Sequence, residues 1–213
     1  MSRRFITAAC ALSAVTACGE IGAPTRADHY EWRFTNGPDT ISFHWPRTAH
    51  PVRFWVADTF NLPTHTETAI ANWKRALLYR DFEGELVADS NAADVIVKAG
   101  FPPGGGGILI GRAPECEALT DIELDFDGRN ITLPMHVYVA RRFDPDLPET
   151  QRCFALVMTH EVGHVMGIFR HSTDPDDIMY FAPTVEQPSL RDRQTAEILH
   201  QSRVTVTTTR RGE

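Results

Sequence analysis

A long helical pattern constrains the fold of this 213-residue chain more than any other feature of its sequence. The pattern runs from Glu149 to about Phe169, and its apolar residues recur at the spacing of one helical face. The apolar residues on that face are Met158, Val162, Val165 and Phe169. Because such a stripe has to pack against a core, the pattern predicts a helix whose opposite face lies at the floor of a cleft.

The opposite face carries the pentad His160-Glu161-Val162-Gly163-His164. Residues at i and i+4 lie about 40° apart on a helix, so both imidazoles can bind one metal ion, and zinc prefers such nitrogen ligands. Glu161 lies about 100° round from His160, where a carboxylate can take a proton from a water activated by the metal. This pattern predicts metal-assisted hydrolysis. Two alternatives explain the pentad less well. A purely structural zinc site would be closed by four protein ligands and would not need Glu161. Two histidines buried in an ordinary core would not explain the acid between them.

The residues that follow the pentad resemble those of the metzincin metalloproteases. Their signature is H-E-x-x-H-x-x-G-x-x-H followed by a methionine turn, and here Gly167 and Met179 occupy the glycine and methionine positions. The run H-S-x-D-P-x-x-x-M-Y from His171 to Tyr180 is most similar to the matrixin-like bacterial members. The resemblance implies a zinc endopeptidase with Zn²⁺ as its cofactor, Glu161 as general base, and a peptide or protein substrate extended in the cleft.

The same resemblance implies an α+β fold. We expect a twisted mixed sheet with two long helices, of which one is the active-site helix, and a small C-terminal lobe after the Met-turn. The catalytic domain is expected over residues 29–203, with the N-terminal lobe to about 168, the C-terminal lobe from about 169, and a polar tail at 204–213. Gly167 would end the helix in a backbone conformation that other residues resist, and Met179 would lie beneath the metal.

One residue departs from the family pattern. The family has its third histidine three residues after the glycine, but Arg170 occupies that position and His171 comes one residue later. A guanidinium stays protonated and cannot bind zinc, so either an insertion brings His171 to the metal or the third ligand is lost. We expect His171 to be the ligand, with Asp174 or Asp176 as weaker substitutes. The alternative function is a catalytically inactive zinc-binding or adhesive lipoprotein that keeps the metzincin fold.

The N-terminus has the pattern of an export signal. Arg3 and Arg4 precede an uncharged stretch over 5–17, so residues 1–17 are expected to be a signal peptide. Residues 15–18 resemble a bacterial lipobox, which predicts lipidation of Cys18 and a tether over 18–28. In lipoproteins, an aspartate after the lipidated cysteine usually means retention at the inner membrane. The residue after Cys18 is Gly19, so an outer-membrane lipoprotein is expected. Ordinary cleavage nearby would instead leave a periplasmic or secreted protein.

Export also bears on the cysteines. Cys10 would leave with the signal peptide and Cys18 would carry lipid, so Cys116 and Cys153 remain. In an oxidising compartment these two predict one disulfide, and the alternative is two buried thiols.

The net charge of −7 argues against a nucleic-acid partner. No apolar run is long enough for a membrane-spanning helix, so contact with a membrane is expected only through the lipid anchor. The length suits one domain or two small lobes that share a cleft.

Several further elements are predicted. Alternating stretches at 30–34 and 40–45 flank a turn and indicate a hairpin, and further strands are expected at 51–57, 94–99, 121–127 and 131–140. Thr64 and Glu67 form a capping-box pattern for a helix over about 65–80, and a last helix should run from Ser189, with Asp192 in its cap, to about Gln201. His136 is a candidate for the cleft lining. The remaining histidines are expected at the surface: His29, His44, His50, His65 and His200.

Overall fold

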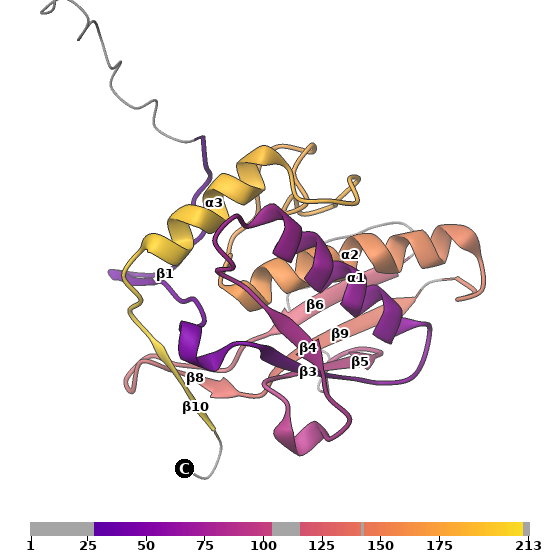
Figure 1. Ribbon diagram of the computed structural model, residues 1–213, viewed down its shortest axis with the longest axis horizontal. Coiled ribbons are helices and arrows are strands. Elements are labelled where there is room, and N and C mark those ends of the chain that lie inside the picture. Colours follow the sequence, from indigo (N-terminus) through magenta and orange to yellow (C-terminus); the bar gives the residue numbers. More distant parts are fainter. Residues whose placement is uncertain (1–27, 104–115, 142, 211–213) are drawn as a thin grey trace, which may run out of the picture.

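The computed structural model describes residues 28–103, 116–141 and 143–210, and its centre is a five-stranded sheet (Figure 1). The strands follow the order β4-β3-β5-β9-β6 across the sheet. They are β3 (Val52–Val56), β4 (Gly84–Leu86), β5 (Val95–Ala99), β6 (Cys116–Asp121) and β9 (Met135–Arg141). All neighbours are parallel except β6, which runs antiparallel to β9 at one end of the sheet.

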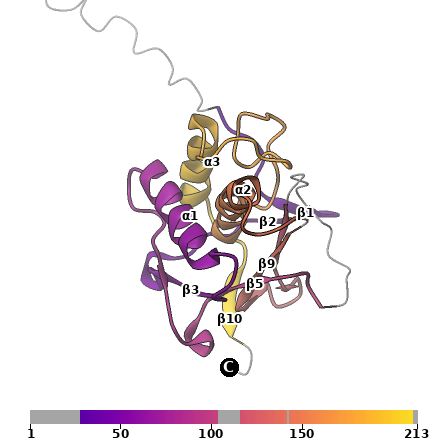
Figure 2. The same ribbon diagram turned by 90° about the vertical axis from the view of Figure 1, so that its right-hand side faces the viewer.

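Two helices, α1 (Leu62–Ala76) and α2 (Pro148–Met166), lie side by side over one face of this sheet, as the end-on view in Figure 2 shows. A third helix, α3 (Leu190–Gln201), follows the site segment in the chain. Trp73 of α1, Phe54 of β3 and Met158 of α2 are fully buried in the core between these layers. The predicted α+β fold is confirmed, and within the described residues no helix is both long and apolar enough to cross a membrane.

Helix α2 forms where the apolar pattern predicts it. Met158, Val162 and Val165 have no exposed surface, which confirms the buried stripe. The helix ends at Gly167, which has a φ of 115°. A Cβ at this position would lie 2.0 Å from the carbonyl oxygen of Phe43, so both the backbone angle and the close approach require glycine.

Two smaller sheets and two short helical turns complete the fold. The hairpin β1 (Phe34–Asn36) and β2 (Asp39–Ile41) is antiparallel, and its strands are shorter than the predicted stretches. The second small sheet joins β7 (Leu124–Asp125), β8 (Asn130–Leu133) and β10 (Thr207–Arg210) in the order β10-β8-β7. The 3-10 helices cover Arg47–Ala49 and Ser90–Ala92.

The predicted start of the first long helix is wrong. The helix begins at Leu62 and ends at Ala76, so it lies about three residues earlier than the capping-box pattern indicates. The residue before it is Asn61 in the left-handed conformation, with no side-chain cap. Pro63 explains the earlier start, because proline is favoured in the first turn, where its missing N–H costs nothing. At α3 the capping box of Ser189 and Asp192 is confirmed.

Part of the predicted polar tail over 204–213 is a strand. Residues 207–210 form β10, which pairs in parallel with β8. Three successive threonines suit a strand because their side chains are β-branched. The guanidinium of Arg210 contacts the Asp94 carboxylate and donates to the carbonyl oxygen of Ala93, so the end of the chain is bound to the start of β5.

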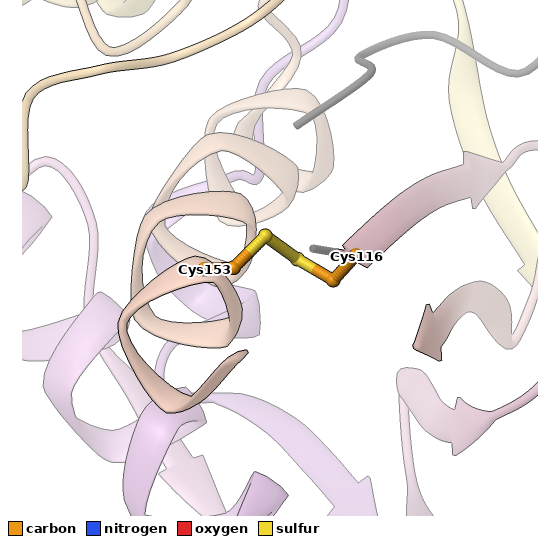
Figure 3. The surroundings of a disulfide bond; sticks show 2 residues. All are labelled: Cys116 and Cys153. Atoms are coloured by element: carbon orange, nitrogen blue, oxygen red, sulfur yellow. A yellow bond between two sulfur atoms is a disulfide. The ribbon is translucent and has the colours of Figure 1, made fainter. Parts of the chain in front are cut away.

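Cys116 and Cys153 form a disulfide, as the sequence predicts. Figure 3 shows the bond joining α2 to the first residue of β6. The sequence did not predict β6. In the predicted strand over 121–127 only Asp121, the last residue of β6, and Leu124–Asp125 belong to strands. The disulfide therefore connects α2 to a strand whose position comes from its pairing with β9.

Candidate active site

Three histidines converge at one point beside α2. His160 and His164 come from successive turns of the helix, and His171 comes from the segment after it. The Nε2 atom of His164 lies 3.1 Å from Nε2 of His160 and 3.2 Å from Nε2 of His171. In the described part of the chain this is the one group of histidine, cysteine and acidic side chains able to hold a metal ion.

The hydrogen bonds of the two helical histidines fix their tautomers. Nδ1 of His160 donates to the carbonyl oxygen of Ile178 at 2.7 Å, and Nδ1 of His164 donates to that of Ile168 at 2.5 Å. A carbonyl oxygen can only accept, so the proton of each neutral ring is on Nδ1. The Nε2 lone pairs are therefore free and face the shared point.

This arrangement fits zinc. Tetrahedral zinc with bonds to nitrogen of 2.0–2.1 Å places its ligand nitrogens about 3.4 Å apart, close to the spacing found here. Burial lowers the pKa of His164 to about 3 and that of His171 to about 4, and it lowers the pKa of His160 well below its ordinary value. All three rings are thus neutral near pH 7, as metal ligation requires.

Glu161 lies next to this cluster and is almost fully buried. Its Oε2 atom accepts a 2.6 Å hydrogen bond from the hydroxyl of Thr120 on β6. Burial raises the pKa of Glu161 to about 8, and the hydrogen bonds from Thr120 act against this rise. A cation held by the histidines would favour the ionised carboxylate. The sequence did not identify Thr120, because no spacing rule links a strand residue to a helix residue 41 positions away.

The segment after α2 brings His171, and not Arg170, to the cluster. The backbone N–H of Phe169 donates to the carbonyl oxygen of Trp32, and that of Ser172 donates to Met179, so the segment is held on both sides of His171. Arg170 is exposed. The positive charge of Arg170 acts on Glu31. The pKa of Glu31 is lowered mainly by the hydrogen bond from Arg33 and to a smaller extent by the charge of Arg170.

The proposed substitutes for His171 lie elsewhere. The Asp174 carboxylate accepts the backbone N–H of Asp176 and lies 3.8 Å from the Arg191 guanidinium. Neither aspartate is part of the group that could hold a metal. The one-residue shift therefore has a structural basis in the path of the segment between Gly167 and Met179.

Met179 is fully buried against the pentad. A Cβ on Gly163 would lie 2.3 Å from the sulfur of Met179, so the methionine packs where the helix has no side chain. Glycine at this position was not singled out from the sequence, although it lies within the pentad. The contact explains how the methionine segment approaches the helix closely enough for the Ile178 carbonyl to orient His160.

Asp192 supports this segment from α3. Its carboxylate accepts the backbone N–H of Ile178 at 2.7 Å and the hydroxyl of Tyr30 at 2.7 Å, in addition to capping its own helix. Burial raises the pKa of Asp192, and hydrogen bonds from Ser189, Tyr30 and Ile178 oppose that rise. The sequence predicted the cap alone, since the contact with Ile178 requires α3 to fold back beneath the site.

The other histidines stand outside the metal group in the described residues. The expectation that His65 lies at the surface is wrong: it is buried, and its Nε2 atom lies 2.8 Å from Oε1 of Gln151 on α2. His136 is half-buried and stacks on Tyr138, and it is not among the residues that line the cavity at the site. Cys18 and the whole signal segment lie outside the described residues.

The comparisons with known proteins agree with this geometry. The family model for matrixins (Peptidase_M10) matches residues 63–198, which is more than half of the chain. The chain belongs to the matrixin family. The matched segment of this matrixin includes all three histidines of the cluster, Glu161 and Met179. Membership implies a zinc-dependent metalloprotease that acts on peptides or proteins. A search of curated proteins found no match.

Proposed function

We propose that this matrixin is a zinc endopeptidase in which His160, His164 and His171 hold the metal and Glu161 is the general base. The observation that carries the proposal is the convergence of three histidine Nε2 atoms at zinc-ligand spacing beside a buried carboxylate. Family membership supports the same chemistry.

When bound, zinc supplies Lewis-acid chemistry that makes water a nucleophile near neutral pH. Glu161 accepts the proton of the attacking water and then gives it to the nitrogen of the amine that leaves. The hydroxyl of Thr120 holds one carboxylate oxygen, Oε2, and the other oxygen would carry out this transfer. The carbonyl groups of Ile178 and Ile168 keep the helical imidazoles in the orientation that points Nε2 to the metal.

The cleft in this proposal lies where the predicted lobes meet. Helix α2 supplies its floor, and the segment from Gly167 to Tyr180 supplies the third histidine. Among the described strands β6 pairs with β9 alone, so its outer edge can add an extended peptide as a further strand. Thr120 on this strand would bring the peptide next to Glu161.

The experiment that tests the proposal is metal content of the purified chain and of His171→Ala. We expect one zinc per wild-type chain and a loss of affinity of at least about a hundredfold in the variant, because an open two-ligand site remains. Zinc that binds His171→Ala as tightly as the wild type would move the third ligand elsewhere. A wild-type chain that takes up no zinc after reloading would contradict the proposal.

The inactive alternative rests on Arg170 crowding the metal. An exposed guanidinium near Glu31 does not favour that reading. Cleavage of a denatured protein with and without a chelator separates the two functions. Chelator-sensitive cleavage supports the endopeptidase, and its absence in a zinc-loaded chain supports the inactive protein.

We also propose that the chain is exported and anchored to the outer membrane by lipid on Cys18. The support is the charge and apolar pattern of residues 1–17 and the lipobox-like residues 15–18. Mass spectrometry of the mature N-terminus tests this. A lipid-modified N-terminal Cys18 is expected, and an unmodified N-terminus would leave a periplasmic or secreted protein.

A further inference from the structure

The three clustered histidines are held in different ways. The Nδ1 atoms of His160 and His164 each donate to a backbone carbonyl oxygen, which fixes the orientation of both rings. His171 lies after α2, and among the described residues no hydrogen bond holds its Nδ1 atom. The position of the third imidazole therefore depends on the backbone of the segment that follows α2.

Ser172, the next residue, fastens this segment to the methionine turn. Its backbone N–H donates to the carbonyl oxygen of Met179 at 2.8 Å. Ser172 is buried, and its hydroxyl donates to Oδ2 of Asp177 at 2.5 Å and accepts the backbone N–H of Asp174 at 3.0 Å. The loop from His171 to Met179 is thus closed by hydrogen bonds at the residue directly after the third histidine.

Asp177 is 2% exposed, and its negative charge is matched by Arg191 in the first turn of α3. The Arg191 guanidinium donates to Oδ2 of Asp177 through Nε at 2.8 Å and through Nη2 at 2.5 Å. Nη2 also donates to the hydroxyl oxygen of Ser172 at 2.6 Å. The hydroxyl of Ser189, the N-cap of α3, donates to Oδ1 of the same carboxylate at 2.6 Å. Ser172, Asp177 and Arg191 therefore form a clamp that joins the loop to α3.

The clamp and Asp192 hold opposite ends of the loop. Asp192 accepts the backbone N–H of Ile178, whose carbonyl oxygen in turn orients His160. The clamp acts at the other end, beside His171. The Arg191 side chain is 23% exposed, so water and salt screen its ion pair less than a pair on the open surface. Loss of either charged partner leaves the other unpaired, and the loop can then move away from α3 at its His171 end.

We propose that the clamp is a positioning device for the metal site, which keeps His171 at the zinc-ligand position. Arg191 and Asp177 are then positioning residues that do not touch the metal. The inference rests on the proposed function and adds to it residues outside the three ligands. A ligand on a fixed backbone loses less conformational freedom when it binds a metal than a ligand on a loose loop, so the clamp should slow the release of zinc.

The test measures how fast the zinc-loaded full chain releases its metal to an excess of chelator. Arg191→Gln removes the positive charge and the forked contact, and Asp177→Asn removes the negative charge. Each should raise the zinc dissociation rate about tenfold. Arg191→Lys keeps the charge without the forked geometry, so its rate should lie between those of the wild type and the glutamine variant. The d–d absorption spectrum of the cobalt-loaded chains should change in the same order, because it reports the geometry of the metal ligands.

Arg53→Gln is the matched control, because it also removes an arginine that binds a buried carboxylate through two bonds. Arg53 donates to both carboxylate oxygens of Asp94, and neither residue belongs to the metal group or lines the cavity beside it. This variant should lose stability in chemical denaturation but keep the zinc dissociation rate and the cobalt spectrum of the wild type. Equal rises of the rate in Arg53→Gln and Arg191→Gln would reduce the clamp to general stability and contradict its positioning role.

A double-mutant cycle decides whether the clamp acts through His171. In the His171→Ala background, Arg191→Gln should not weaken zinc binding further, because the ligand that the clamp positions is gone. A loss of affinity as large as in the wild-type background would overturn the inference. If Arg191→Gln does not fold, Ser172→Ala, which removes only the hydroxyl of the clamp, takes its place in both experiments.

The outcomes separate this inference from the proposed function. A wild-type chain that takes up no zinc would contradict both. A chain that binds zinc and releases it equally fast with and without the clamp would contradict the positioning role alone. None of these measurements depends on the cleavage of a peptide.

Discussion

The floor and the wall of the candidate active site are built in opposite ways. The floor comes from one short run of sequence, from His160 to His171, in which helical geometry and one glycine bring three imidazoles together. The wall that faces it draws on residues from Phe34 to Phe169, carried by separate strands, hairpins and loops. The candidate reactive groups are therefore local in sequence, whereas the shape of the cavity beside them depends on how distant segments pack.

The largest expected effect belongs to the floor. Glu161→Gln should lower kcat by about a thousandfold, because the amide cannot take a proton from the attacking water. Its zinc content should match the wild type, since Glu161 is not among the three clustered histidines. Peptide hydrolysis and metal analysis of the same sample measure both. Undiminished activity would remove Glu161 from the mechanism.

Acid should destabilise the metal-free chain through the same region. Five histidines have pKa values lowered mainly by burial: His50, His160, His164, His171 and His200. Between about pH 6.5 and 4 the unfolded chain binds protons that these native rings do not, so the free energy of unfolding falls as the pH falls. Each ring can lower the free energy of unfolding by at most about 1.4 kcal/mol per pH unit.

Glu161 and Asp192 oppose this fall, because their raised pKa values make the native chain take up protons as the pH drops. The histidines outnumber them, so a net loss of stability from pH 7 to pH 5 is expected. Chemical denaturation in a chelator measures it, with His171→Asn as a variant that should show a shallower fall. A free energy of unfolding that is equal at the two pH values would contradict the expectation.

The disulfide links floor to wall, and its removal should affect stability more than chemistry. Cys116→Ser/Cys153→Ser opens a loop of 37 residues, which corresponds to about 3–4 kcal/mol of lost stability. Because the bond holds the start of β6 to α2, kcat/KM for peptide cleavage should also fall while zinc stays bound. Thermal unfolding and steady-state peptide cleavage test the two parts. A variant with the wild-type melting temperature would show that the packing of β6 against β9 is sufficient.

Thr120 is the residue through which β6 contacts the carboxylate of Glu161. Thr120→Val keeps the shape of the side chain but removes the hydrogen bond to Glu161, so kcat should fall about tenfold with KM little changed. Thr120→Ser keeps the hydroxyl and should recover most of the activity. Steady-state kinetics of the two variants on one peptide test whether the hydroxyl positions Glu161. Equal kcat values for the valine and serine variants would show that it does not.

The smallest effect is expected at Arg170. Its side chain is exposed, so Arg170→Ala should change zinc affinity and kcat by less than about twofold. The neighbouring His171→Ala is the contrast, because that change removes a clustered imidazole. Metal titration of both variants compares them. A large gain in activity in Arg170→Ala would mean that the guanidinium reaches the metal when substrate is bound.

The fold was predictable where the pattern is periodic and local. The buried stripe of α2, its end at Gly167 and the capping box of α3 follow from helical spacing and capping preferences. The start of α1 was missed because Pro63 outweighs the capping pattern at Thr64. Strand β6 and the pairing of β10 with β8 were missed because a strand only four to six residues long is fixed by its partner in the sheet.

The sequence by itself determined the reactive groups: two histidines one helical turn apart, the acid between them, and a glycine that turns the chain. Those relations are short-range and follow from the geometry of one helix. Only the tertiary structure decided that His171 and not Arg170 joins them, that Thr120 holds Glu161, and that Phe34 and Phe126 meet above the cavity. These contacts join residues whose separation is set by the packing of sheet, helices and hairpins, which no local spacing rule specifies.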